Sequence, residues 1–210
     1  MYVKDIIKSV ADILDLTEIK DYLNELNNAS TDENTDSDST DSSTSSSTNE
    51  STEIVVPDTL NDLLLAVNIT NNNLASNYYE LLAKTNVVSS NSIIKFSKIT
   101  DKNILEIKSI EDINGVKLDF KIMSDGIHLF QDCSCVVEYS YLPDEVKFDD
   151  DIDYYLKVNT LLFSYGVASE YLFLKGDIED AYNWDLKFKN TLFAMSRPKR
   201  SIYFPSKRWY

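Results

Sequence analysis

The sequence predicts an α+β protein, mainly a helical bundle with an antiparallel β-meander inserted and an extended C-terminal arm. Three observations predict this class. Apolar residues recur at helical spacing in the outer parts of the chain, and the middle is rich in Ile, Val, Phe and Tyr between short polar turns. The last residues mix basic and aromatic side chains without a regular period. With 43% hydrophobic residues among 210, the chain has material for an ordinary core.

Residues 1–28 are expected to form two short amphipathic helices. Val3, Ile6 and Val10 follow helical spacing, as do Ile19, Leu23 and Leu26 in the second segment. Residues 29–53 read as an insertion, since every residue from Ser30 to Thr52 is Ser, Thr, Asp, Asn or Glu. Such a stretch has no apolar area to offset the entropy of ordering a backbone, so we expect a disordered, solvated segment.

Residues 54–196 form the main domain, which opens with a helix. Asp58 or Thr59 serves as its N-cap, with Pro57 just outside. Apolar residues then alternate steps of four and three, which predicts a helix to about Ala83. Asn71-Asn72-Asn73 is a poor helix interior and offers a place where the helix would break.

The middle of the domain, residues 92–142, predicts an antiparallel meander of four or five strands. Asn114-Gly115 and Asp125-Gly126 are strong signals for two-residue hairpin turns, because both turn positions prefer positive φ. The strands are rich in β-branched and aromatic residues. Their expected ranges are 92–100, 103–110, 116–123, 127–131 and 135–141.

Residues 149–196 are expected to form a helical hairpin. The first helix opens at Asp149, Asp150, Asp151 and Asp153, where the helix dipole favours negative charge, and Lys175-Gly176 ends it. Asp177 and Asp180 cap the second helix, which runs to about Ser196. Small residues in the first helix would allow a neighbouring subunit to approach closely, and we take them as subunit-packing residues: Gly166, Ala168 and Ser169.

The sequence carries no recognisable catalytic apparatus, so we expect a protein that is not an enzyme and uses neither cofactor nor metal. Cys133 and Cys135 are too few for a structural zinc site and are expected to be reduced core thiols. The single histidine, His128, lies in an apolar strand, as structural histidines often do. No glycine motif for phosphate binding is present. No apolar run approaches the roughly 20 residues that cross a bilayer, so we expect no membrane contact and synthesis in the cytoplasm.

Charge divides the chain into an acidic body and a basic end. The net charge is −15, yet from Leu186 to Tyr210 there are seven basic residues and no acidic one. The arm, residues 197–210, could bind nucleic acid, dock on a protein or fray. We favour protein docking because the acidic body repels DNA and wet aromatic groups gain nothing. The expected docking residues are Arg197, Lys199, Arg200, Tyr203, Phe204, Lys207, Arg208, Trp209 and Tyr210.

The last third of the chain resembles the head–tail connector proteins of tailed phages, also called adaptor or tail-tubular proteins. The order of elements carries the resemblance, with the Ser/Thr/Asp tract as an insertion. The residues that match are Tyr165-Gly166-Val167-Ala168-Ser169-Glu170-Tyr171, Leu174-Lys175-Gly176-Asp177, Tyr182-Asn183-Trp184-Asp185, Phe188, Lys207-Arg208-Trp209, Val136-Val137-Glu138-Tyr139-Ser140-Tyr141-Leu142-Pro143 and Val3-Lys4-Asp5-Ile6-Ile7.

The resemblance implies a structural protein of the virion neck. Its subunits would form a homo-oligomeric ring, commonly dodecameric, that joins the portal protein to tail or nozzle proteins. The ring would extend the DNA channel, and DNA would pass without sequence-specific binding. The C-terminal arm would contact the portal. Two other hypotheses stay open: a DNA-packaging accessory protein acting through the basic tail, and a hydrolase using His128.

Overall fold

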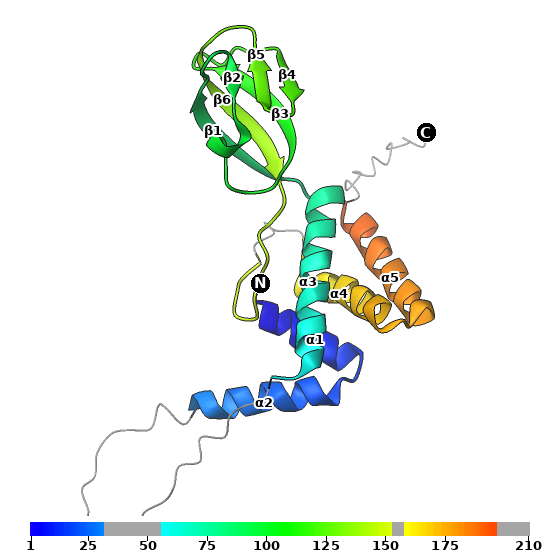
Figure 1. The fold of residues 1–210 in the computed structure, drawn as a ribbon. Helices are drawn as coiled ribbons and strands as arrows, with labels where there is room; N and C mark the ends of the chain where they lie inside the picture. Colours follow the sequence, from blue (N-terminus) through cyan, green and yellow to red (C-terminus); the bar gives the residue numbers. More distant parts are fainter. Residues whose placement is uncertain (32–55, 153–157, 197–210) are drawn as a thin grey trace, which may run out of the picture. The chain divides into compact units, whose positions relative to one another are not determined.

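The computed structural model describes residues 1–31, 56–152 and 158–196, which form five α-helices and two small antiparallel sheets (Figure 1). The expected α+β class is confirmed. The chain divides into two compact units. One, the helical unit, comprises Met1–Leu63 and Asp149–Tyr210, and the other, the β unit, comprises Leu64–Phe148. The division falls inside α3 (Asp58–Asn77).

The first two helices form where the apolar spacing predicts them, as α1 (Val3–Ile13) and α2 (Thr17–Thr31). The apolar stripe of α1 is fully buried and packs against α4 (Thr160–Lys175). The helix α2 is tied to the start of α3 by a hydrogen bond of 2.8 Å from Thr59 Oγ1 to Glu18 Oε2. The first residues of the expected insertion are helical, because α2 continues to Thr31; residues 32–53 lie outside the described residues.

A helical hairpin of α4 and α5 (Ile178–Ser196) completes the helical unit, and the two helices lie side by side (Figure 1). Gly176 adopts a left-handed conformation with φ of 84°, and its N–H reaches back to Leu172 and Phe173 carbonyls. The predicted stop at Lys175-Gly176 is therefore confirmed. No helix within the described ranges is long and apolar enough to cross a membrane.

The predicted start of this hairpin at Asp149 is wrong. Residues 149–152 are extended or turning: the backbone N–H of Val3 donates to the Asp150 carbonyl at 3.0 Å, and the N–H of Ile152 donates to the Met1 carbonyl at 2.9 Å. The helix begins only after Asn159, whose side chain accepts from the Leu162 N–H at 2.8 Å. Pairing with the first residues of the chain thus replaces the helix dipole as the setting of the acidic run, and Asp153 lies outside the described residues.

The helix α3 ends earlier than its apolar stripe predicts. It passes through the three asparagines without breaking and stops at Asn77, where the N–H groups of Tyr78 and Tyr79 both reach the Leu74 carbonyl. The chain then enters β1 (Leu81–Val88), a strand the helical spacing concealed. All eight residues of β1 pair antiparallel with β6 (Ser134–Tyr141), so long-range pairing overrides the local helical pattern.

The β unit is not a meander. Its strands form two three-stranded sheets, in the orders β1-β6-β3 and β2-β5-β4, where only β4 and β5 are both consecutive and paired (Figure 1). The buried faces of both sheets share one apolar cluster that includes Ile94, Ile110, Ile127 and Val137. The remaining strands are β2 (Ile93–Ile94), β3 (Ile104–Asp112), β4 (Phe120–Met123) and β5 (Gly126–Leu129), with a 3-10 turn at Phe96–Lys98.

Both predicted turn sites are turns, one of them shifted. At Asn114-Gly115 the Asp112 N–H donates to the Val116 carbonyl at 2.9 Å, and Gly115 has φ of 79°. In the second hairpin Met123 pairs with Gly126, so the two-residue loop is Ser124-Asp125 rather than Asp125-Gly126. Gly126, with φ of 149°, packs so closely on Ile94 that a Cβ would collide with the Ile94 carbonyl oxygen.

We predict that Gly126→Ala destabilises the β unit more than Gly115→Ala. A Cβ at either glycine meets a backbone conformation that costs L-residues about 1–2 kcal/mol. At Gly115 no atom lies within 4 Å, whereas at Gly126 the Ile94 backbone of the pairing strand must also move. Urea unfolding followed by circular dichroism measures both variants; equal losses in the free energy of unfolding would contradict the close packing on Ile94.

Candidate functional site

The helix α5 presents two apolar faces, of which α4 covers one. The inner face carries Ala181, Phe188 and Leu192, each at most 3% exposed. A second line of large apolar side chains recurs at steps of four, four and seven residues, which places them along one stripe. We call this the α5 stripe; its members are Ile178, Tyr182, Leu186 and Phe193, exposed by 68%, 61%, 49% and 60%.

Charges beside the α5 stripe are arranged by sign along the helix. Glu179 and Asp180 lie in the first turn, where the helix dipole favours acids. Basic residues follow in the second half: Lys189 Nζ donates to Asp185 Oδ2 at 2.7 Å, and Lys187 Nζ lies 3.9 Å from the centre of the Trp184 ring. The α5 surface therefore runs from acidic at its start to mixed or basic towards the arm.

The small residues of α4 serve the hairpin itself. Gly166, Ala168 and Ser169 are all buried within the chain, and Ser169 Oγ donates to the Ala181 carbonyl of α5 at 2.9 Å. Their small size lets α4 and α5 approach closely. They leave almost no surface for another chain, so packing between subunits at these residues stays a prediction without support from their positions.

One carboxyl group in the hairpin is under electrostatic stress. Glu170 of α4 is half-buried, and burial raises its pKa above the ordinary value, helped by the negative charge of Asp185 across the hairpin. Lys189, already bonded to Asp185, lowers the pKa of Glu170 only in part. Ionised Glu170 is thus held at a cost where the two helices meet.

The predicted histidine chemistry finds a carboxylate rather than a nucleophile. His128 lies in β5, the central strand of its sheet, and its Nε2 is 2.8 Å from Asp125 Oδ1. The hydrogen bond with His128 lowers the pKa of Asp125. The other candidate groups are equally plain: Cys135 is buried with its thiol pKa raised to about 11, chiefly by burial. Across the described ranges, no cluster of three or more His, Cys, Asp or Glu residues could hold a metal.

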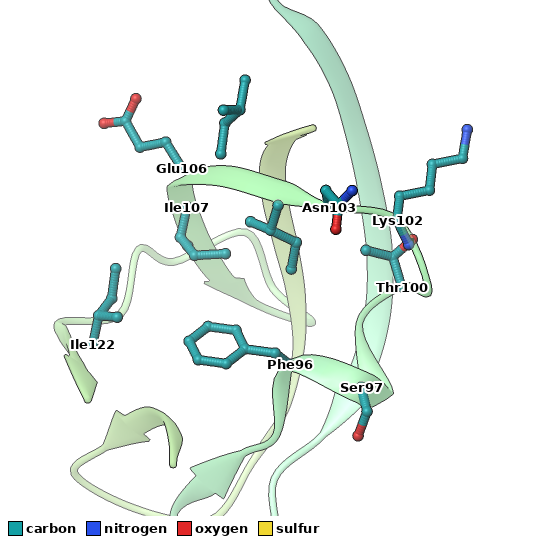
Figure 2. A pocket seen from close by; sticks show the side chains of 10 residues that line it. Phe96, Ser97, Thr100, Lys102, Asn103, Glu106, Ile107 and Ile122 are labelled. Atoms are coloured by element: carbon teal, nitrogen blue, oxygen red, sulfur yellow. The ribbon is translucent and has the colours of Figure 1, made fainter. Parts of the chain in front are cut away.

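The β unit contains a groove of about 400 Å³ along β3. Figure 2 shows Phe96, Ile107 and Ile122 around an apolar hollow, with Lys102 and Thr100 at its far rim. The Lys102 ammonium is already engaged, 3.6 Å from Asp144 Oδ2 and 4.5 Å from the centre of the Tyr141 ring. The groove has the size of a small-ligand pocket, but its lining brings together no nucleophile and base.

The expected docking arm cannot be placed, because residues 197–210 lie outside the described residues. Of the predicted functional residues, the structure therefore locates only the small residues of α4. Sequence reasoning missed the α5 stripe. Its signal was present in the spacing of Ile178, Tyr182 and Leu186, but the spacing alone does not tell which of two apolar faces the fold covers.

We predict that Glu170→Gln raises the melting temperature at pH 7 and leaves it nearly unchanged at pH 4. Because the folded-state pKa of Glu170 is raised, the cost is absent below the ordinary value of 4.5 and appears as pH rises through the folded-state pKa. Glu179→Gln, in the exposed first turn of α5, is the control and should lower stability slightly. A gain at both pH values for Glu170→Gln would refute the electrostatic origin.

No protein-family model matches the chain, and no curated protein matches it in sequence. Its function is therefore inferred from its own residues. Among them, the α5 stripe is the feature that packing within its helical unit does not explain.

Proposed function

We propose that the chain is a structural assembly subunit, a head–tail connector protein of a tailed phage that acts as a member of a ring. The single observation that carries the assembly role is the α5 stripe. Exposed apolar side chains scattered singly are ordinary, but an aligned set along a whole helix marks a surface that another protein covers. The phage assignment draws on the resemblance of the α4–α5 hairpin and its flanking segments.

The charge distribution supports a subunit that surrounds DNA without gripping it. The chain carries −15, and its last 14 residues hold five basic and no acidic side chains, so residues 1–196 carry −20. Tight non-specific DNA binding needs Lys and Arg to displace phosphate counterions, and an acidic wall does the opposite. Such a body suits a channel through which DNA slides.

In this proposal the parts have separate roles. Head-to-tail contacts between identical subunits close a ring, dodecameric by the resemblance, and the α5 stripe contributes to that contact. The arm docks on the portal through its aromatic anchors and basic groups, while tail or nozzle proteins bind the opposite side. The protein resides in the virion neck after synthesis in the host cytoplasm.

The basic arm also favours a second candidate, a DNA-packaging accessory protein. Five basic groups interleaved with Tyr, Phe and Trp are chemically suited to phosphate contact and base stacking. This alternative requires DNA binding that weakens steeply with salt and disappears when four basic residues of the arm are replaced: Lys199, Arg200, Lys207 and Arg208.

We predict that a chain ending at Arg197 keeps its fold but no longer binds the portal. The full chain should appear as a closed ring in negative-stain images when mixed with portal protein, because the arm supplies the docking anchors. A four-fold Ala variant of the same basic residues is the matched control for charge alone. A full chain that stays monomeric beside the portal, or one that binds DNA instead, would refute the connector role.

We also predict that Leu186→Asp prevents ring formation with the portal. The substitution puts a charge in the middle of the α5 stripe, where a neighbouring subunit would have to desolvate it. Phe130→Asp, at an 88% exposed apolar side chain of the β unit, is the control and should leave the ring intact. Sedimentation velocity of the mixtures reports the assembly, and identical behaviour of both variants would exclude the stripe as a subunit contact.

A further inference from the structure

The α5 stripe ends one turn before the arm begins. Phe193 is its last member, α5 ends at Ser196, and the next 14 residues are the arm. The arm carries aromatic and aliphatic groups of its own, which gain by leaving water. Stripe and arm are thus two apolar partners on one continuous piece of chain: Ile178, Tyr182, Leu186 and Phe193 on α5, and Ile202, Tyr203, Phe204, Trp209 and Tyr210 in the arm.

We propose that in the free chain the arm folds back along the α5 stripe of the same molecule and covers it. The arm would then act as an intramolecular latch. Its release on binding a larger protein exposes the stripe for a neighbouring subunit, a consequence that rests on the proposed function. The latch itself requires only the stripe and the arm.

The lengths of the two parts fit. At 1.5 Å per residue the 19 residues of α5 span about 28 Å. At about 3.3 Å per residue the 14 residues of the arm reach about 46 Å when extended. After the reversal at the end of α5, the arm can therefore run the whole stripe and bring Trp209 to the neighbourhood of Ile178.

Charge fits the same antiparallel register. The first basic residues of the arm, Arg197 to Arg200, would lie at the C-terminal end of α5, the negative end of the helix dipole. The last pair, Lys207 and Arg208, would arrive near the acidic start of α5, where Glu179 and Asp180 lie beyond Asp177. The arm is the only strongly basic segment in the sequence, and this surface offers it negative charge at both ends.

The arm of the same molecule is favoured over a second copy. A tether this short gives the arm an effective concentration of about millimolar at the stripe, far above the concentration of a dilute protein. A second copy would also have to bring its own body close, and bodies that carry −20 repel each other. The stripe is therefore occupied in cis until a partner of higher affinity takes the arm.

Tryptophan fluorescence tests the latch, because Trp184 and Trp209 are the only tryptophans in the sequence. In Trp184→Phe the emission comes from Trp209 alone. We expect a blue-shifted emission maximum and weak quenching by acrylamide, both unchanged over a wide range of protein concentration. Adding Ile178→Asp to this variant should free Trp209 and bring its quenching to that of a tryptophan amide in water.

The control and the contrary outcomes are distinct. Adding Phe130→Asp in place of Ile178→Asp should leave Trp209 protected, and circular dichroism confirms that each variant is folded. Protection that grows with protein concentration would show the stripe of a second copy as the seat and overturn the latch, as would a Trp209 that is fully quenchable in the parent variant. Because no portal is present, failure here is separate from failure of the connector role.

Discussion

The burial of α4 is the constraint on which the helical unit depends. Its side chains are apolar on nearly every side, and Leu162, Phe163, Val167 and Ala168 are inaccessible to solvent. Such a helix is stable only when other elements enclose it. Helices α1 and α5 pack against it, each with one apolar stripe. Once α5 has spent its inner face on α4, its second stripe has no role in this packing, which is why it is read as a surface for assembly.

The β unit shows where sequence reasoning reaches its limit. Strand identity was predicted from composition for most of the segment, and the turns at Asn114-Gly115 and before Gly126 followed from local φ preferences. The partners of each strand were not, because pairing β1 with β6 joins residues more than 45 positions apart through a register that no local pattern encodes. The same distance explains β1 itself: Leu81 fits a helical stripe as well as a strand, and only the pairing with Tyr141 decides.

The helical unit was predicted better because its signals are local. Caps, the glycine stop and apolar spacing gave α1, α2 and α5 within a few residues. The start of α4 failed where a non-local interaction intervened, as the residues after Asp149 pair with the beginning of the chain. Burial likewise settled the role of Ser169: a small residue predicts close approach, but its hydrogen bond to Ala181 identifies the approaching helix as α5 of the same chain.

The candidate site combines a structural face that sequence did not reveal with a charged segment that sequence revealed at once. An acidic chain that exposes an apolar stripe faces a risk of premature association, which like-charge repulsion lowers but does not remove, since repulsion is screened beyond about 10 Å in ordinary salt. Covering the stripe with a segment of opposite charge removes both the exposed apolar area and part of the net charge. The position of the arm directly after α5 makes that cover available within the molecule. It links the timing of assembly to capture of the arm.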